Sequence, residues 1–204
     1  MILDFVGVQG SGKGTQAKII SKKLELAHIS TGDLLRGIQG ELKEKVDSII
    51  NEGKLIPNDL MLQILKERMK SPDCEKGIIL DGFPRNIEQA RDLDKELSID
   101  KIIEIKISDE MSLKRLSGRV TCEDCGEGYN LYTELKPSKE GICDKCGGKL
   151  VQRADDNEEA IKKRIQTYHQ DTEPILSHYQ NKVITVDGEQ SVEKISQDIL
   201  NSFN

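Results

Sequence analysis

The apolar residues of this 204-residue chain fall into short runs that alternate with longer amphipathic stretches. After the first apolar run, Ala17, Ile20 and Leu24 recur at helical spacing and share one face. A second helix is predicted from Asp33 onward. This alternation predicts an α/β fold in which a parallel sheet lies between two layers of helices. The predicted strands are residues 2–8, 28–29, 77–81, 101–107 and 182–186.

Two segments interrupt this rhythm. Residues 30–56 are polar and helical in pattern, and residues 119–154 are rich in glycine, cysteine and short polar stretches. We interpret both as small domains inserted into the α/β core. The core is then expected to comprise residues 1–29, 57–118 and 155–204.

The amino-acid composition argues against several classes of protein. Charged residues make up 32% and hydrophobic residues 36%, a balance typical of globular proteins. A net charge of −6 and only 3% aromatic residues argue against a nucleic-acid-binding protein. The start of the chain lacks the pattern of a signal peptide, and no run approaches a membrane span. We therefore expect a cytosolic protein without membrane contacts.

Four of the five cysteines form a C-x₂-C-x₁₇-C-x₂-C array: Cys122, Cys125, Cys143 and Cys146. Two such pairs can complete a tetrahedral site with four sulfur ligands, which favours zinc, although iron suits the same ligands. The absence of a position left open for substrate predicts a structural ion. Cys74 lies apart and receives no role.

The most informative motif is GVQGSGKGT at residues 7–15, which follows the first predicted strand and opens the first predicted helix. In this context G-x-x-x-x-G-K is typical of a phosphate-binding loop. Glycines allow backbone N–H groups to surround phosphate oxygens, and the helix N-terminus adds positive potential. Lys13 is expected to reach the outer phosphates.

Gly14 follows Lys13 directly, and the resulting pattern G-x-x-G-x-G-K-G-T resembles the loop of adenylate kinases. The resemblance extends along nearly the whole chain, to the family's long-lid form with a four-cysteine metal site. It implies a P-loop enzyme that transfers the γ-phosphoryl group of Mg-ATP to AMP, giving two ADP reversibly. The further motifs are residues 30–36 (STGDLLR), 53–57 (GKLIP), 81–85 (DGFPR), 118–119 (GR) and 152–157 (QRADDN).

The chain also departs from the family's pattern. Val120 stands where a second arginine often follows the Gly–Arg pair, and Gln9 stands where the loop commonly has proline. The stretch between Arg36 and Gly53 is short by a few residues. None of these changes removes a residue to which a role is assigned.

Eight of the 30 basic residues are arginine, and six of these fall at positions that the resemblance marks as nucleotide contacts. An arginine fork binds phosphate oxygens bidentately, which a lysine ammonium cannot do. The resemblance places Arg36 and Arg85 on the acceptor phosphate and Arg115 on the ATP adenine. It places Arg119, Arg153 and Arg164 around the transferring group, the last two also reaching AMP.

The family's remaining contacts follow in the same way. The expected catalytic residues are Lys13, Arg85, Arg119, Arg153 and Arg164. For ATP the loop contributes Gly10, Ser11, Gly12, Lys13, Gly14 and Thr15, with Tyr129 and the backbone near Gln190 as weaker contacts. For AMP the base would face Thr31 and Gln89, beside the backbone of Lys54, Leu55, Ile56, Gly82, Phe83 and Pro84.

Some alternatives stay open at this point. Asp81 is expected to hold Mg²⁺ through waters, with Asp33 and Thr15, but Asp33 also fits a capping box with Ser30. The competing functions are a kinase for another nucleoside monophosphate and a zinc-ribbon interaction module switched by ATP. The resemblance also implies a monomer, and a lid at residues 119–154 that closes over ATP and excludes water.

Overall fold

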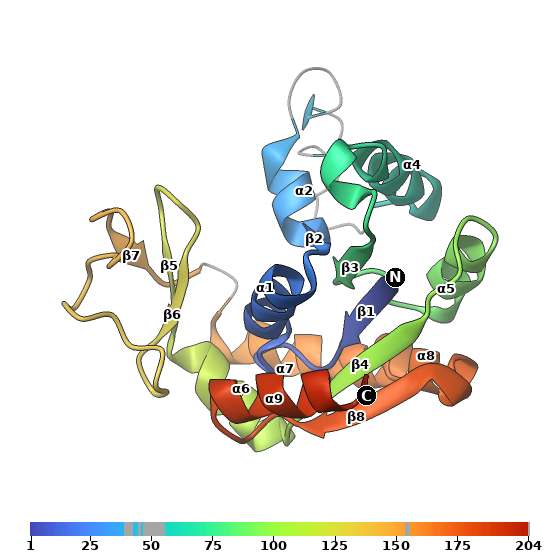
Figure 1. The fold of residues 1–204 in the computed structure, drawn as a ribbon. Helices are drawn as coiled ribbons and strands as arrows, with labels where there is room; N and C mark the ends of the chain where they lie inside the picture. The colour runs from blue at the N-terminus through green and yellow to red at the C-terminus, as the bar shows by residue number, and fades with distance from the viewer. Residues whose placement is uncertain (39–42, 45, 47–55, 154–155, 204) are drawn as a thin grey trace.

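The computed structural model of the chain describes residues 1–38, 43–44, 46, 56–153 and 156–203. Its central sheet has five parallel strands in the order β2-β3-β1-β4-β8, with helices on both faces (Figure 1). The predicted α/β class and all five predicted strands are confirmed. The strands are β1 Ile2–Val6, β2 Ala27–Ser30, β3 Ile78–Asp81, β4 Lys101–Lys106 and β8 Val183–Asp187.

The helices that cover the sheet begin at polar caps. Ser30, Asn86, Ser108, Asn157 and Ser191 each accept a hydrogen bond from the backbone N–H three residues later, as N-cap side chains do. A π-helix, Tyr168–Thr172, joins two helices near the end of the chain. The α-helices are α1 Lys13–Leu24, α2 Thr31–Gly37, α4 Asn58–Met69, α5 Ile87–Asp94, α6 Asp109–Ser117, α7 Glu158–Thr167, α8 Pro174–His178 and α9 Val192–Asn201.

Apolar side chains fill both faces of the central sheet, which explains why its strands are almost continuously hydrophobic. Neighbouring residues of a strand point to opposite faces. Leu3 and Phe5 of β1 therefore pack with α1 and α9 on one side. Val6 belongs to a second cluster, with residues of α4, α5, α6, α7 and α8. The core thus consists of three layers.

A second, smaller sheet lies within residues 119–154 and stands to one side of the central sheet (Figure 1). Its antiparallel strands have the order β6-β5-β7 and are β5 Arg119–Cys122, β6 Gly128–Asn130 and β7 Leu150–Val151. The sequence predicted an inserted segment here but not these strands. Among the helices that the structure describes, none has the length and apolar character needed to cross a membrane.

Candidate active site

A cavity of about 1140 Å³ lies at the carboxyl ends of the parallel strands. This edge is where ligands bind in open parallel α/β sheets. The β5–β6 hairpin forms part of its wall, through residues such as Tyr129. The predicted nucleotide contacts that line it are Gly10, Ser11, Gly12, Lys13, Gly14, Thr15, Thr31, Gly82, Pro84, Arg85, Arg115, Arg119, Tyr129, Arg153, Arg164 and Gln190.

The phosphate loop connects β1 to α1 inside this cavity. Gly12, the N-cap of α1, has φ +98°, a left-handed conformation that favours glycine. The Lys13 ammonium donates to the carbonyl oxygens of Gly7 at 2.5 Å and Val8 at 3.0 Å. Burial lowers the pKa of Lys13 to about 8, although the nearby Asp81 carboxylate acts in the opposite direction. The Lys13 side chain is therefore folded back onto the backbone of the phosphate loop.

Asp156 holds two of the arginines together. Its fully buried carboxylate accepts hydrogen bonds from Arg119 Nε at 2.8 Å and Arg119 Nη2 at 2.7 Å. Arg164 Nη2 donates to the same carboxylate at 2.7 Å. A bidentate arginine–carboxylate pair fixes orientation as well as distance. Asp156 thus fixes two guanidinium groups from distant parts of the sequence beside each other at the cavity wall.

Arg85 follows β3 in a tight turn, where its Nε donates to the carbonyl oxygen of Gly82 at 2.7 Å. Gly82 has φ +91°, and a Cβ there would lie 2.8 Å from Thr31 Oγ1. The turn therefore requires glycine. Burial lowers the pKa of Arg85, while Asp81 raises it and the charge of Arg153 lowers it further. The charge of Arg153 thus acts on Arg85, and both residues line the cavity.

The acceptor-base residues are held by internal hydrogen bonds. Thr31 is buried, and its hydroxyl donates to Gly82 O at 3.1 Å. Gln89 is also buried; its Oε1 accepts from Arg85 N–H at 2.7 Å and its Nε2 donates to Asn58 Oδ1 at 3.0 Å. Gln89 is therefore not a solvated surface residue, but it is not among the residues that line the cavity.

Other predicted acceptor contacts lie in the core or outside the described residues. The Phe83 side chain is part of the apolar core, which leaves its backbone for a nucleotide contact. Ile56 packs against the same core. Lys54 and Leu55, and residues 154–155 of a predicted motif, lie outside the described residues, and the Arg36 side chain does too.

Arg115, on α6, connects the phosphate loop to the loop after β8. Its Nη2 donates to Gly188 O at 2.8 Å, and its Nη1 lies 3.4 Å from the carbonyl oxygens of Gly10 and Ser11. Burial lowers the pKa of Arg115. Gln190, in the loop after β8, donates to Asp187 O at 3.3 Å. Arg115, predicted at the ATP adenine, is thus bonded to the loop that carries Gln190, another predicted ATP contact.

The groups predicted to bind Mg²⁺ all line the cavity: Thr15, Asp33 and Asp81. The predicted cap is present as well, since Ser30 Oγ accepts from Asp33 N–H at 3.3 Å. This bond uses the backbone of Asp33 rather than its carboxylate. His28 Nε2 lies 3.3 Å from Asp81 Oδ2, a partner that the sequence did not reveal.

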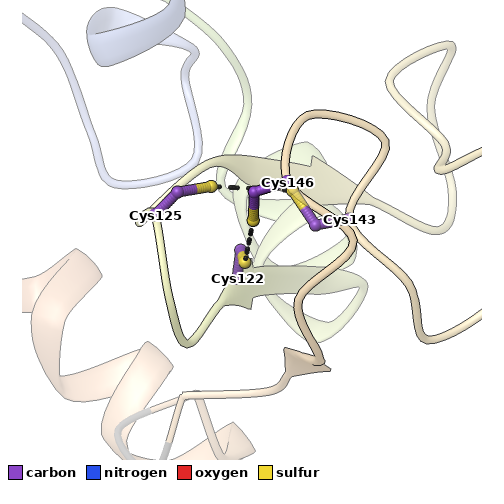
Figure 2. Close-up of side chains that lie close together, drawn as sticks. All are labelled: Cys122, Cys125, Cys143 and Cys146. Carbon is purple, nitrogen blue, oxygen red and sulfur yellow. Dashed lines mark hydrogen bonds between the residues drawn. The ribbon is translucent and has the colours of Figure 1, made fainter.

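The four cysteines of the array form a compact cluster (Figure 2). Their sulfur atoms all lie within 4.8 Å of one another, and the nearest pairs are 3.5 and 3.6 Å apart. Sulfur ligands about 2.3 Å from a tetrahedral zinc ion require separations of roughly 3.8 Å. The separations lie around this value, so the cluster is compatible with a zinc ion.

Tyr129 is closely associated with this cluster. Its Oη lies 3.5 Å from Cys143 Sγ and accepts from Asp144 N–H at 2.8 Å. The hydrogen bond with Cys143, followed by burial, raises the pKa of Tyr129 to about 12. The hydroxyl is thus bonded at the cysteine cluster, while the residue also lines the cavity.

Sequence reasoning missed the roles of two residues at this site. Asp156 was noted within a motif, but its function in joining Arg119 to Arg164 was not assigned; a carboxylate flanked by arginine motifs was the available signal. Glu134, in the turn after β6, accepts from Val192 N–H at 2.6 Å, which joins this turn to the first turn of α9. No sequence pattern indicated this contact.

Comparisons with known proteins give one and the same family over nearly the whole chain. A family model described as adenylate kinase matches residues 5–184. An adenylate kinase of Caldicellulosiruptor saccharolyticus is 42% identical, with 100% of this chain and 99% of that protein covered. One of Acetivibrio thermocellus is 44% identical, covering 100% and 98%. One of Archaeoglobus fulgidus is 44% identical, covering 98% and 96%.

Proposed function

Because this chain belongs to the adenylate kinase family, it transfers the γ-phosphoryl group of ATP to AMP, and we propose that it does so within the cavity described above. The proposed catalytic groups are Lys13, Arg85, Arg119, Arg153 and Arg164. The nucleotide contacts proposed are those named from the sequence.

The observation that carries this proposal is the carboxylate of Asp156, which holds Arg119 and Arg164 in one cavity with Lys13. Phosphoryl transfer spreads charge over the equatorial oxygens of a loose transition state. Cations fixed before the reaction stabilise that charge without reorganising during it. Asp156 therefore acts as a positioning residue for two of the proposed catalytic arginines.

The chemistry needs no general base. The bond from the γ-phosphorus to the bridging oxygen of ATP breaks, and a bond to an AMP phosphate oxygen forms. The attacking oxygen is already anionic, so no proton has to be removed. Thr15, Asp33 and Asp81 are proposed to hold Mg²⁺, which would neutralise charge on the phosphate chain of ATP.

We propose that residues 119–154 act as a lid and residues 30–56 as the monophosphate-binding insertion. Arg119 lies at the entry to the lid and Arg153 near its exit, so closure would bring their charges to the bound nucleotides. Adenylate kinase is itself a standard example of an enzyme with a closing lid. The ion proposed at Cys122, Cys125, Cys143 and Cys146 is zinc, with a structural role.

The test is to incubate the purified enzyme with Mg-ATP and each monophosphate in turn, and to separate the nucleotides by chromatography. We expect rapid ADP formation with AMP and slow or no turnover with UMP, CMP or GMP. Equal turnover with another monophosphate would contradict the proposed roles of Thr31 and Gln89. The absence of turnover with every monophosphate would contradict the function. Neither a kinase for another monophosphate nor an ATP-switched module is favoured by the family match.

We also propose where the enzyme acts and its oligomeric state. The enzyme is expected to be a cytosolic monomer, and free cysteines held as metal ligands fit a reducing compartment. Light scattering after size-exclusion chromatography tests the oligomeric state, with a mass near 22.9 kDa expected.

A further inference from the structure

Gln9 lies in the phosphate loop at the position where this chain departs from the family's usual proline. It lines the cavity. Its carbonyl oxygen accepts a hydrogen bond from Ser112 Oγ at 2.6 Å, which fixes the backbone of Gln9 against α6. The same helix carries Arg115 and leads directly into Arg119. Gln9 is thus held between the loop and the element that connects to the proposed lid.

Within the described part of the chain, neither end of the Gln9 amide makes a hydrogen bond. Oε1 is buried without a partner, whereas Nε2 is not among the buried atoms. The accessible end of the amide is therefore its NH₂ group, a double donor. The buried Oε1 can only accept a hydrogen bond, so it cannot bind an anionic oxygen, and a contact with phosphate would be made by Nε2.

Other glutamines at this site differ from Gln9. Gln16 Nε2 donates to Val192 O at 2.9 Å, and Gln190 Nε2 donates to Asp187 O at 3.3 Å. Gln89 uses both ends of its amide, with Arg85 and Asn58. These side chains would have to break an internal bond to reach a ligand. Gln9 can donate to one without that cost.

We propose that Gln9 Nε2 donates a hydrogen bond to an oxygen of the transferring phosphoryl group. The proposal rests on the function assigned to this cavity. A neutral amide donor suits an anionic oxygen, and it adds a directed contact to the charges of Lys13 and the arginines. Gln9 exchanges no proton: the phosphorus passes from the oxygen of ADP to that of AMP while the amide hydrogen bond strengthens. Gln9 is thus assigned as an additional catalytic residue.

The experiment compares the wild-type enzyme with Gln9→Met and Gln9→Glu. Methionine matches the size of glutamine and removes the donor, whereas glutamate places an acceptor-only carboxylate beside the phosphates. We expect kcat to fall about tenfold in Gln9→Met, the loss typical of one hydrogen bond to a charged group, and further in Gln9→Glu. KM for ATP and AMP should change less than about twofold, and the melting temperature should not fall.

A second measurement separates the transition state from the ground state. The dissociation constant of Mg-ATP is compared with that of Mg-ADP, aluminium fluoride and AMP, which together mimic the phosphoryl group in transfer. We expect Gln9→Met to weaken binding of the mimic about tenfold and to leave Mg-ATP binding unchanged. Equal weakening of both ligands would show a ground-state contact and overturn the proposal, as would wild-type values for both.

The activity of the wild-type enzyme distinguishes a failure of the proposed function from a failure of the role proposed for Gln9. A wild-type enzyme that makes no ADP from ATP and AMP contradicts the proposed function itself. A fully active wild type with an equally active Gln9→Met variant contradicts only the role of Gln9.

Discussion

The two sheets of this protein are stabilised in opposite ways. The central sheet is covered on both faces by extensive clusters of buried apolar side chains. In the small sheet the buried cluster that the structure describes comprises only Cys122, Cys143 and Leu150, and two of these are proposed metal ligands. Small domains that cannot bury enough apolar surface commonly depend on a metal or disulfides. The core is therefore expected to fold by itself, and the small sheet to depend on its ion.

Removal of the metal is expected to have the largest effect, because it should unfold the small sheet and leave the central sheet folded. Structural zinc sites contribute on the order of 10 kcal/mol to folding, far more than the apolar contacts of the small sheet. We expect chelation, or Cys143→Ser, to unfold residues 119–153 while the central sheet remains folded, with loss of turnover. Hydrogen exchange resolved by residue measures this, and added zinc should reverse the effect of the chelator. An unchanged melting temperature without metal would contradict the structural role of the ion.

The next largest effect should arise where the two regions meet, at Arg119. Arg119→Ala removes the charge that Asp156 orients, and arginines acting on a transferring phosphoryl group contribute about 10³-fold or more to kcat. We expect a loss of that size in steady-state kcat, with both sheets still folded. Arg91→Ala is the matched control, because Arg91 is exposed on α5 and does not line the cavity. Near-normal turnover of Arg119→Ala would remove the arginine from the catalytic set.

The contrast between the regions also explains what the sequence could predict. The central strands were found because residues such as Leu3, Phe5 and Ile103 lie in runs that are buried on both faces. The strand Gly128–Asn130 gives no such signal, since it has only three residues and all of them are exposed or half-buried. Apolar patterns in a sequence reveal strands whose side chains are buried, and few side chains of the small sheet are buried.

The same limit applies to the candidate site. The phosphate loop and the cysteine array are local patterns, so their residues could be named from spacing. The pairing of Arg119 with Asp156 joins residues 37 positions apart, and Gln89 meets Asn58 across 31 positions. Such contacts depend on how segments pack in three dimensions. The resemblance to a family located Arg119, Asp156 and Gln89 but not Asn58, and it did not reveal which side chains touch.

A smaller effect is expected from Asp4, a carboxyl group inside the otherwise apolar central strand. Its side chain is buried, and Oδ2 has no hydrogen-bond partner in the described part of the chain. Burial, together with the charge of Asp81, raises the pKa of Asp4 well above its ordinary value. The folded state therefore keeps a proton that the unfolded state loses, and this difference reduces stability as the pH rises above the unfolded pKa.

Asp4→Asn keeps the size of the side chain and removes its ionisation. We expect it to raise the free energy of unfolding at pH 7, by about 1.4 kcal/mol for each pH unit by which the folded protein raises the pKa of Asp4. The gain should shrink toward pH 4, where the carboxyl is increasingly protonated in the unfolded state as well. Urea unfolding at the two pH values measures it, and a gain that is equal at both would contradict the ionisation argument.

The smallest effect concerns Lys13 in the phosphate loop. Its pKa of about 8 in the free enzyme reflects burial, so the lysine is about half protonated at pH 8. Phosphates of bound ATP favour the charged form and raise this pKa, so binding should take up about half a proton at pH 8 and little at pH 6.5. The affinity for Mg-ATP should accordingly fall as the pH rises above 8. Calorimetry in two buffers of different ionisation enthalpy measures the uptake, and Lys13→Arg, which stays charged, should abolish it. If Lys13→Arg took up as many protons as the wild type, the protons would be binding to another group. Lys13 would then be charged both before and after ATP binds.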